Sequence, residues 1–406
     1  MHDSTLSKTT RPVAGTSAPL VALFAGASGL SVANVYYAQP LLDSLAADFH
    51  IDQAAVGAVI TATQLGSVLA LVLLIPLGDR LERKRLMLAQ ALVLVAALAC
   101  VALAGSSGTL LAGMLAVGML GTAMTQGLIA YAATVAAPGE RGHVVGAAQG
   151  GVVIGLLLSR VLAGLVADLG GWRWVYGLSA ALMLALTALL WAALPRQPAP
   201  ERPLPYAQLL LSMLKLLRQQ RALQVRGLLA MMMFAAFSVF WSALALPLSA
   251  APYSLSHSTI GAFGLVGIAG ALAATRAGRW ADRGWGQRTS LGALLLLLAA
   301  WPVFGLSNHS LGFMVLGTLM LDLAVQALQV TNQSMILQGS MQAHSRLIGC
   351  YMLFYAVGSG VGAIAATAVY AAAGWAGVCW LGGGISLLAL LAWAGTLRYM
   401  ALPDGR

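Results

Sequence analysis

The chain has 406 residues, of which 60% are hydrophobic and only 8% are charged, and its formal net charge is +10. Soluble globular domains carry about 25% charged residues, so this composition excludes an ordinary soluble protein. The positive charge falls in short clusters at the ends of apolar stretches, which suits anionic lipid better than a groove for nucleic-acid phosphates. We therefore expect contact with membrane lipid and no nucleic-acid partner.

Twelve apolar stretches follow a polar N-terminal tail at 1–17. Each is about 20 residues long, enough to cross the hydrocarbon core of a bilayer as an α-helix. In chain order they are 18–38, 54–77, 86–105, 108–131, 144–167, 173–194, 227–250, 257–275, 289–306, 310–334, 347–372 and 376–398. The predicted fold class is an all-α membrane protein with 12 transmembrane helices.

Lys and Arg residues concentrate on one side of this predicted membrane. The two tails and every second linker, starting with the linker after the second helix, hold 20 of the 22 Lys and Arg residues. The exceptions are Arg173, in a linker of the other set, and Arg160, inside the 144–167 helix. Cytoplasmic loops collect Lys and Arg. We expect both termini to face the cytoplasm and the protein to lie in a bacterial cytoplasmic (inner) membrane.

The second half of the chain repeats the first at an offset of 203 residues. Gly155 corresponds to Gly358, and Gly171-Trp172 corresponds to Gly374-Trp375. Equivalent helices are six apart, so both halves insert in the same orientation. Parallel repeats of this kind hold substrate near the midplane, where the two halves meet. The sequence thus predicts two pseudo-symmetric six-helix bundles, 18–194 and 227–406.

The longest linker, 195–226, joins the two halves. It opens with five prolines, which disfavour helix, and continues with apolar residues at helical spacing from Tyr206 to Arg218. This pattern predicts an amphipathic helix on the inner leaflet. The alternative is a soluble tether without lipid contact.

Two loops resemble the signature loop of the major facilitator superfamily, once in each half. They read Pro76-Leu-Gly-Asp-Arg-Leu-Glu-Arg-Lys-Arg85 and Gly278-Arg-Trp-Ala-Asp-Arg-Gly-Trp-Gly-Gln-Arg288. The segments 34–42 and 170–176 are similar to those of the bacterial twelve-helix drug:proton antiporter and efflux-permease branch. The resemblance covers essentially the whole chain.

This resemblance implies that the first, second, fourth and fifth helices of each half line a central cavity. It also implies that the signature loops act as gates, with Asp79 and Arg80 clamping the cytoplasmic face when the protein is open outward. The predicted gating residues are Asp79, Arg80, Arg83, Asp282 and Arg283. The alternative is that these loops are only positively charged anchors. A single chain holds both halves of the pathway, so we expect a functional monomer.

Asp322 is the candidate for proton coupling, because it is the acid that lies deep inside a predicted span. An ionised carboxylate is costly there, and such residues usually mark ion or proton pathways. Gln326, Gln329 and Gln333 follow on the same helix face. This polar face should therefore turn toward a cavity or toward the other half. The alternative is a hydrogen-bond network that only packs helices together.

Arg160 is the matching charge in the first half, on the same helix face as Gln149. Its guanidinium can bind a substrate carboxylate or respond to the protonation of Asp322. The alternatives are a permanent structural pair, or a side chain that extends to the membrane surface.

Further candidates for the cavity are polar or aromatic residues on the expected lining helices. They are Asn34, Tyr37, Gln64, Gln126, Gln149, Trp241, Gln326, Gln329, Tyr351 and Tyr355. Aromatic and amide groups in an apolar cavity suit an amphipathic organic solute. For each aromatic residue, simple packing is the alternative.

No pattern in the sequence indicates an enzyme. There is no GxxxxGK[ST] or HExxH motif, and Cys100, Cys350 and Cys379 all lie in apolar spans without metal-ligand spacing. We expect no cofactor and no metal, with a proton gradient as the energy source.

The sequence favours a secondary transporter that exports a small amphipathic organic compound in exchange for protons. The first alternative is uptake of a small organic anion by proton symport. The second is a membrane receptor or scaffold that does not transport.

Overall fold

The predicted fold of two six-helix bundles is confirmed. The computed structural model describes residues 16–137, 140–195, 205–251, 253–267, 281–307, 310–337 and 344–400. Within these ranges, 10 helices are long and apolar enough to cross a membrane. Twelve spans were predicted. The number found is lower because the last two spans form one continuous element, α15, and because the predicted 257–275 span is described only to residue 267.

The N-terminal bundle holds the first six predicted spans. Its elements are α1 (Ala18–Tyr36), η1 (Gln39–Leu41), α2 (Leu42–Phe49), α3 (Ala58–Leu69), η2 (Ala70–Leu74), η3 (Pro76–Asp79), α4 (Arg83–Ala102), α5 (Ser107–Val135), α6 (Arg141–Gly170) and α7 (Trp172–Ala193). Helical structure in the first span extends past the predicted end at residue 38. Pro40 interrupts it, because proline cannot donate a backbone hydrogen bond.

The C-terminal half begins with the linker helix and then repeats the pattern. Its described elements are α8 (Tyr206–Gln219), α9 (Arg221–Ala243), α10 (Ala245–Ser249), α11 (His257–Ala262), η4 (Phe263–Val266), η5 (Ala281–Trp285), α13 (Gly286–Gly305), α14 (Leu311–Leu337) and α15 (His344–Met400). Gly374, with φ 61° and ψ −160°, breaks α15 into the last two predicted spans.

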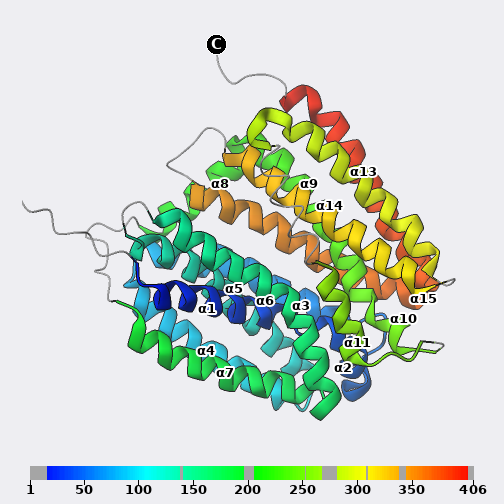
Figure 1. Ribbon diagram of the computed structural model, residues 1–406, viewed down its shortest axis with the longest axis horizontal. Coiled ribbons are helices and arrows are strands. Elements are labelled where there is room, and N and C mark those ends of the chain that lie inside the picture. Colours follow the sequence, from blue (N-terminus) through cyan, green and yellow to red (C-terminus); the bar gives the residue numbers. More distant parts are fainter. Residues whose placement is uncertain are drawn as a thin grey trace, which may run out of the picture.

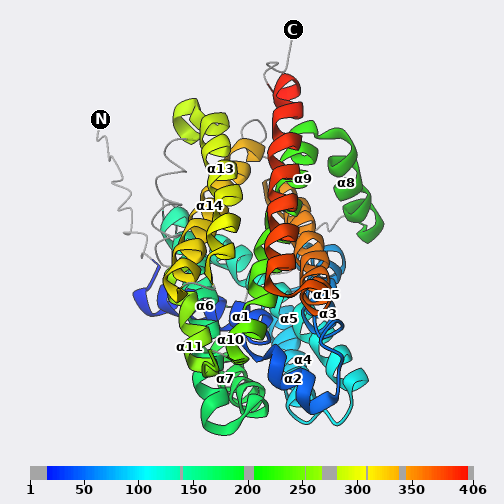
Figure 2. The ribbon, with the colours of Figure 1, turned by 90° about the vertical axis from the view of Figure 1, so that its right-hand side faces the viewer.

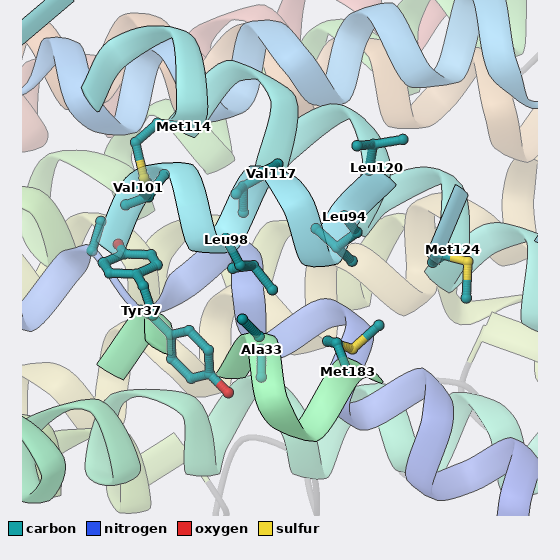
Figure 3. Packing of buried hydrophobic residues seen from close by; sticks show 14 of the residues in the cluster. Ala33, Tyr37, Leu94, Leu98, Val101, Met114, Val117, Leu120, Met124 and Met183 are labelled. Carbon is teal, nitrogen blue, oxygen red and sulfur yellow. The ribbon is translucent and has the colours of Figure 1, made fainter. Parts of the chain in front are cut away.

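Each bundle has its own apolar core. Figure 3 shows part of the N-terminal core, where Leu94 and Leu98 of α4 face α5 residues such as Val117, and Tyr37 lies nearby. The C-terminal core centres on α9 and α13, with the rings of Phe240 and Phe304 stacked at 4.5 Å. Two separate cores allow the bundles to move as units.

The internal repeat is visible in the backbone as well as in the sequence. Gly171 and Gly374 both adopt positive φ, 83° and 61°, at the turn into the last helix of their half. Gly155 packs its bare backbone against Gly29 of α1, and its counterpart Gly358 packs against Met231 of α9. Glycine at these positions lets the fifth and first helices of each half approach closely.

The linker helix α8 lies beside α9 and the start of α15 (Figure 2). Its Leu209 and Met213 are buried, whereas Leu211 is 62% exposed. The hydroxyl of Tyr206 donates to the carbonyl of Leu73 in the N-terminal bundle at 2.8 Å. The helix therefore contacts both halves and still presents apolar side chains outward.

The C-terminal bundle begins slightly earlier than the predicted boundary at residue 227. Arg226 is fully buried within α9 and donates to Ser290 Oγ at 2.8 Å and to Asn332 Oδ1 at 3.3 Å. The predicted linker ends with Arg226 because this residue is charged. Ser290 and Asn332, which are distant in the sequence, hold its side chain inside the bundle.

The two bundles meet toward the end of the molecule that carries α2, α10 and α11 (Figure 1). We call this the distal end. The other end carries α8, Arg80, Arg83 and the start of α15, and we call it the basic end.

Candidate functional site

Arg160 projects from α6 into the junction between the two bundles and is only 2% exposed. Its Nε donates to Gln39 Oε1 at 2.7 Å, and Nη1 donates to the carbonyl of Leu156 at 3.4 Å. Its Nη2 is buried and has no hydrogen-bond partner. An unused donor on a buried guanidinium is costly, so Arg160 offers a site for an acceptor that enters the junction.

Aromatic rings surround this guanidinium. Its Cζ lies 3.8 Å from the ring centre of Trp241, 5.5 Å from that of Tyr36 and 5.9 Å from that of Phe237. Cation–π contacts inside about 6 Å stabilise a desolvated cation by up to about 2 kcal/mol. The rings therefore help to keep Arg160 charged away from water.

Asp322 reaches the same junction from α14 and is 6% exposed. Its carboxylate interacts electrostatically with Arg160, but no ion pair of 4.0 Å or less joins the two side chains. The indole of Trp241 lies close to both residues. The two opposite charges are thus near neighbours without being locked together.

Three glycines, Gly261 in α11, Gly264 in η4 and Gly267 directly after η4, make room for these two charges. A Cβ on Gly264 would lie 3.4 Å from the Cβ of Arg160, and one on Gly267 would lie 2.9 Å from Asp322 Oδ2. A Cβ on Gly261 would collide with the backbone of Arg160. Side chains larger than hydrogen would push Arg160 or Asp322 out of the junction.

A pair of tyrosines joins the bundles at the same level. The hydroxyl groups of Tyr36 in α1 and Tyr355 in α15 are hydrogen-bonded to each other. Gln64 of α3 is 3% exposed, and its Oε1 has no partner. The junction therefore offers several polar groups that a ligand can engage.

The distal end of the junction is closed. Thr61 Oγ1 donates to the carbonyl of Gly360 at 2.7 Å, and the backbone N–H of Gly57 donates to Thr367 Oγ1 at 3.2 Å. Gly164 of α6 packs directly against the backbone of His257 in α11. These contacts join the two bundles across both sides of the junction.

A cavity of about 890 Å³, including its mouth, opens at the basic end. Its walls are η2, η3, α4, α5, α8 and the start of α15. They are mainly apolar, with Arg83, Gln90, Gln126 and Arg346 as polar groups. Among the described residues, hydrogen bonds join the bundles at the distal end, whereas a cavity lies at the basic end.

Asn34 and Tyr37 were predicted to line the central cavity, but their side chains lie inside the N-terminal bundle. Asn34 Oδ1 accepts from Ser179 Oγ at 2.6 Å, and the ring of Tyr37 packs edge-on against Tyr176. Tyr36, one residue earlier, faces the junction instead. One residue along a helix rotates a side chain by about 100°, and the apolar pattern of this span did not reveal which face is inward.

Of the other predicted cavity residues, Trp241, Gln64 and Tyr355 lie at the junction, whereas Gln126, Gln149, Gln326, Gln329 and Tyr351 are not among the groups described there. Gln126 lines the basic-end cavity, and Gln149 is exposed on α6. Gln329 accepts a 2.6 Å hydrogen bond from the hydroxyl of Tyr351. Gln326 is partly buried on α14. In this state the polar face of α14 is divided between the junction and the basic end.

The predicted gating residues fall at the basic end. The side chains of Asp79 and Asp282 lie outside the described part of the chain. Arg80 and Arg283 are exposed. Arg83 donates to the carbonyls of Gly78 at 3.1 Å and Ala130 at 3.2 Å, which ties the signature loop to α5.

Sequence reasoning missed Tyr36, Gln39 and Phe237, all of which contact Arg160. Gln39 and Tyr36 stand out as polar groups near the end of the first span. Phe237 carried no such signal in an apolar helix, because its role depends on how α9 crosses α6.

Two bundles of membrane-spanning helices, closed at one end and with buried charges between them, define a membrane transporter. The profile of the Major Facilitator Superfamily matches residues 24–244 and 226–403. A putative uncharacterized transporter YgaY of Escherichia coli K12 is 39% identical over 384 residues, covering 95% of this chain and 97% of that protein.

A probable transporter SCO4007 of Streptomyces coelicolor is 30% identical over 373 residues, covering 90% of this chain and 84% of its own length. The crystal structure of the peptide transporter POT in complex with sulfate shares the fold, with a TM-score of 0.78, 15% identity and 96% coverage of each chain. The chain belongs to the Major Facilitator Superfamily, and it is a secondary transporter of that kind.

Proposed function

We propose that this transporter exports a small amphipathic organic compound in exchange for protons. The observation that carries the proposal is the placement of Asp322, a buried carboxyl group at the junction of the bundles beside Arg160. Burial without a direct ion pair makes the charged form of a carboxyl group costly. A proton that binds Asp322 removes this cost, and the loss of that proton restores attraction to Arg160.

The exchange follows from competition at this junction. With Asp322 neutral, Arg160 is held by Gln39 and the ring of Trp241. With Asp322 charged, the two opposite charges attract more strongly, which changes how α6 and α14 pack. An organic solute that binds among the rings favours one of these arrangements, and the proton favours the other. A ligand shifts such an equilibrium only by its difference in affinity for the two states.

The rings around Arg160 support an amphipathic substrate. Trp241, Phe237 and Tyr36 provide flat apolar surfaces, and Gln64 provides an amide oxygen without a partner. Binding sites for organic solutes typically combine apolar walls with a few polar groups that fix orientation. We place the transporter in a bacterial inner membrane as a functional monomer, with both termini and the basic end in the cytoplasm, without a cofactor.

A second function is favoured by the unpaired Nη2 of Arg160. This donor can bind a carboxylate, so uptake of a small organic anion together with protons is the alternative. In that case the substrate and the proton would neutralise Arg160 and Asp322 together.

The direction of proton movement tests the proposal. Purified protein is reconstituted into liposomes that contain a pH-sensitive dye, and candidate compounds found by thermal-shift screening are added on one side. Antiport moves protons toward the side to which the compound was added, whereas symport moves protons away from that side. Symport would reject export in favour of uptake, and substrate flux without proton movement would reject coupling.

A further inference from the structure

His257, at the start of α11 in the C-terminal bundle, lies between two carboxylates of the N-terminal bundle at the distal end. Its Nε2 is 3.3 Å from Asp43 Oδ1 of α2, and its Nδ1 is 3.1 Å from Asp168 Oδ1 of α6. Ser44 Oγ lies 2.9 Å from the same Nε2. We call Asp43, Asp168 and His257 the distal clasp. We propose that it is a second proton-binding site, and that a proton on His257 holds the distal end closed.

The number of hydrogens on the imidazole ring of His257 decides how many carboxylates it can donate to. A neutral imidazole has one N–H donor and one acceptor nitrogen, whereas the charged form has two donors. Both ring nitrogens of His257 face carboxylate oxygens, and carboxylates only accept. In a neutral ring with its hydrogen on Nδ1, Nε2 can accept from the hydroxyl of Ser44 but points a lone pair at Asp43. Only the charged ring can donate to both carboxylates.

The surroundings of the clasp leave these two acids as the charged groups that face the ring. The helix α6, which packs against α11, carries Asp168 and Arg160 and, at its opposite end, Arg141 and His143. The helix α2, which reaches the ring through Asp43 and Ser44, also carries Asp48, which pairs with Arg173. The guanidinium of Arg160 instead lies over the ring of Trp241, and its side-chain stem runs along Gly264, two turns further along. The elements α10, η1 and η4 contribute no titratable side chain.

The side chains of the clasp are about one quarter exposed, at 24% for His257, 25% for Asp43 and 27% for Asp168. Solution at the distal end can therefore deliver the proton. Within the described residues, no three His, Cys, Asp or Glu side chains are arranged to hold a metal ion. A proton is the ligand that this geometry fits.

The clasp links proton binding to conformation because its members belong to different bundles. When the distal end opens, His257 moves away from both acids and loses their attraction for its proton. Proton binding and closure must then favour each other. Closure is favoured below the ordinary range of histidine titration, near pH 6.5, and weakens as the pH rises above it.

Part of the contact does not depend on the proton. The backbone N–H groups of His257 and Ser258 donate to the two oxygens of Asp168 at 3.0 and 2.9 Å. These bonds do not depend on the ring proton, so the closed state keeps part of its stability at high pH. Protonation therefore adjusts the closing equilibrium rather than acting as an all-or-none switch.

The test measures distal closure without substrate, in full-length protein in lipid nanodiscs. Spin labels at Gln53 and Ala372, both exposed at the distal end of their bundles, report the separation by pulsed electron resonance. Cys100, Cys350 and Cys379 are replaced first. The background carries Asp322→Asn, so that the result does not depend on the proposed coupling site. Two partly exposed ion pairs predict a change of about threefold to tenfold in the closing constant between about pH 5 and pH 8.

We expect His257→Gln to abolish this pH dependence and to hold the closing constant near its high-pH value. Asp43→Asn is expected to reduce the pH dependence by about half while leaving the backbone bonds to Asp168 intact. The proposal is overturned if His257→Gln keeps the full pH dependence, or if the separation does not change with pH in the parent protein.

Discussion

A methyl group at Gly261 should selectively destabilise the state in which the distal end is closed. A Cβ there would collide with the carbonyl oxygen of Arg160, and it would lie 2.8 Å from that carbonyl carbon and 3.1 Å from Val161 Cα. All of these are backbone atoms of α6 in the other bundle, which cannot move aside by a change of rotamer. The collision exists only while the bundles are in contact.

The expected destabilisation of the closed state follows from overpacking, which costs about 1–3 kcal/mol in a well-packed core. At about 1.4 kcal/mol per factor of ten, Gly261→Ala should lower the closing constant by about fivefold to 150-fold. The bundles themselves should not be weakened, because Gly→Ala in a helix interior stabilises it by up to about 1 kcal/mol. The melting temperature should therefore stay the same or rise while closure is lost.

The assay is the labelling rate of a cysteine that closure protects. Thr61→Cys places a thiol at the contact with Gly360, in a chain without its native cysteines, and an impermeant maleimide is added to right-side-out vesicles. Gly150→Ala on α6 is the matched control, since a Cβ there meets nothing within 4 Å. We expect faster labelling in Gly261→Ala and no change in the control. Equal labelling rates in the two variants would refute the reasoning.

Three further variants test parts of the fold by thermal unfolding in detergent. Gly171→Ala should lower the free energy of unfolding by about 1–3 kcal/mol, because φ 83° with ψ 169° is nearly restricted to glycine. Gly177→Ala is the control, since a Cβ there meets nothing within 4 Å, and it should lose no stability. Equal losses in the two variants would contradict this prediction. Arg226→Met should keep or raise the midpoint, because an apolar side chain of similar volume avoids burying a guanidinium whose Nε and Nη2 have no hydrogen-bond partner among the described residues. A large drop would mean that its hydrogen bonds dominate. Arg173→Ala should cost at most about 1 kcal/mol, because its ion pair with Asp48 is half exposed, and its effect should shrink in high salt.

The architecture was predictable because hydropathy and charge act over whole segments. Twenty apolar residues in a row cross a bilayer whatever their detailed packing, and the repeated glycines Gly171 and Gly374 mark equivalent turns in both halves. Arg160 and Asp322 could be found for the same reason. A charge inside an apolar span has to turn toward other protein groups, and both side chains do lie at the junction of the bundles.

Other features depend on how helices cross, which one-dimensional patterns do not encode. Tyr37 was predicted to lie at the junction, but the ring of Tyr37 packs against Tyr176 and the neighbouring Tyr36 lies near Arg160 instead. His257 lies at the boundary between a loop and a predicted span, and its two acids are 89 and 214 residues away in the sequence. Arg226 belongs to the predicted linker 195–226, but its side chain lies inside the bundle beside Ser290 and Asn332.

The distal clasp and the Asp322 junction would give the transporter two proton sites with different tasks. One lies near the distal surface and adjusts closure, and the other lies between the bundles and couples the proton to substrate. Because they sit on different elements, Asp43→Asn and Asp322→Asn should have separable effects on conformation and on coupled flux.

The most direct test of the central claim compares two kinds of transport by Asp322→Asn in liposomes. Counterflow exchanges labelled for unlabelled substrate and requires no net proton movement, whereas accumulation against a gradient requires coupling. We predict that Asp322→Asn retains counterflow but loses accumulation driven by a pH gradient. Accumulation at the wild-type level would contradict the account, because the buried carboxyl group would then have no part in coupling.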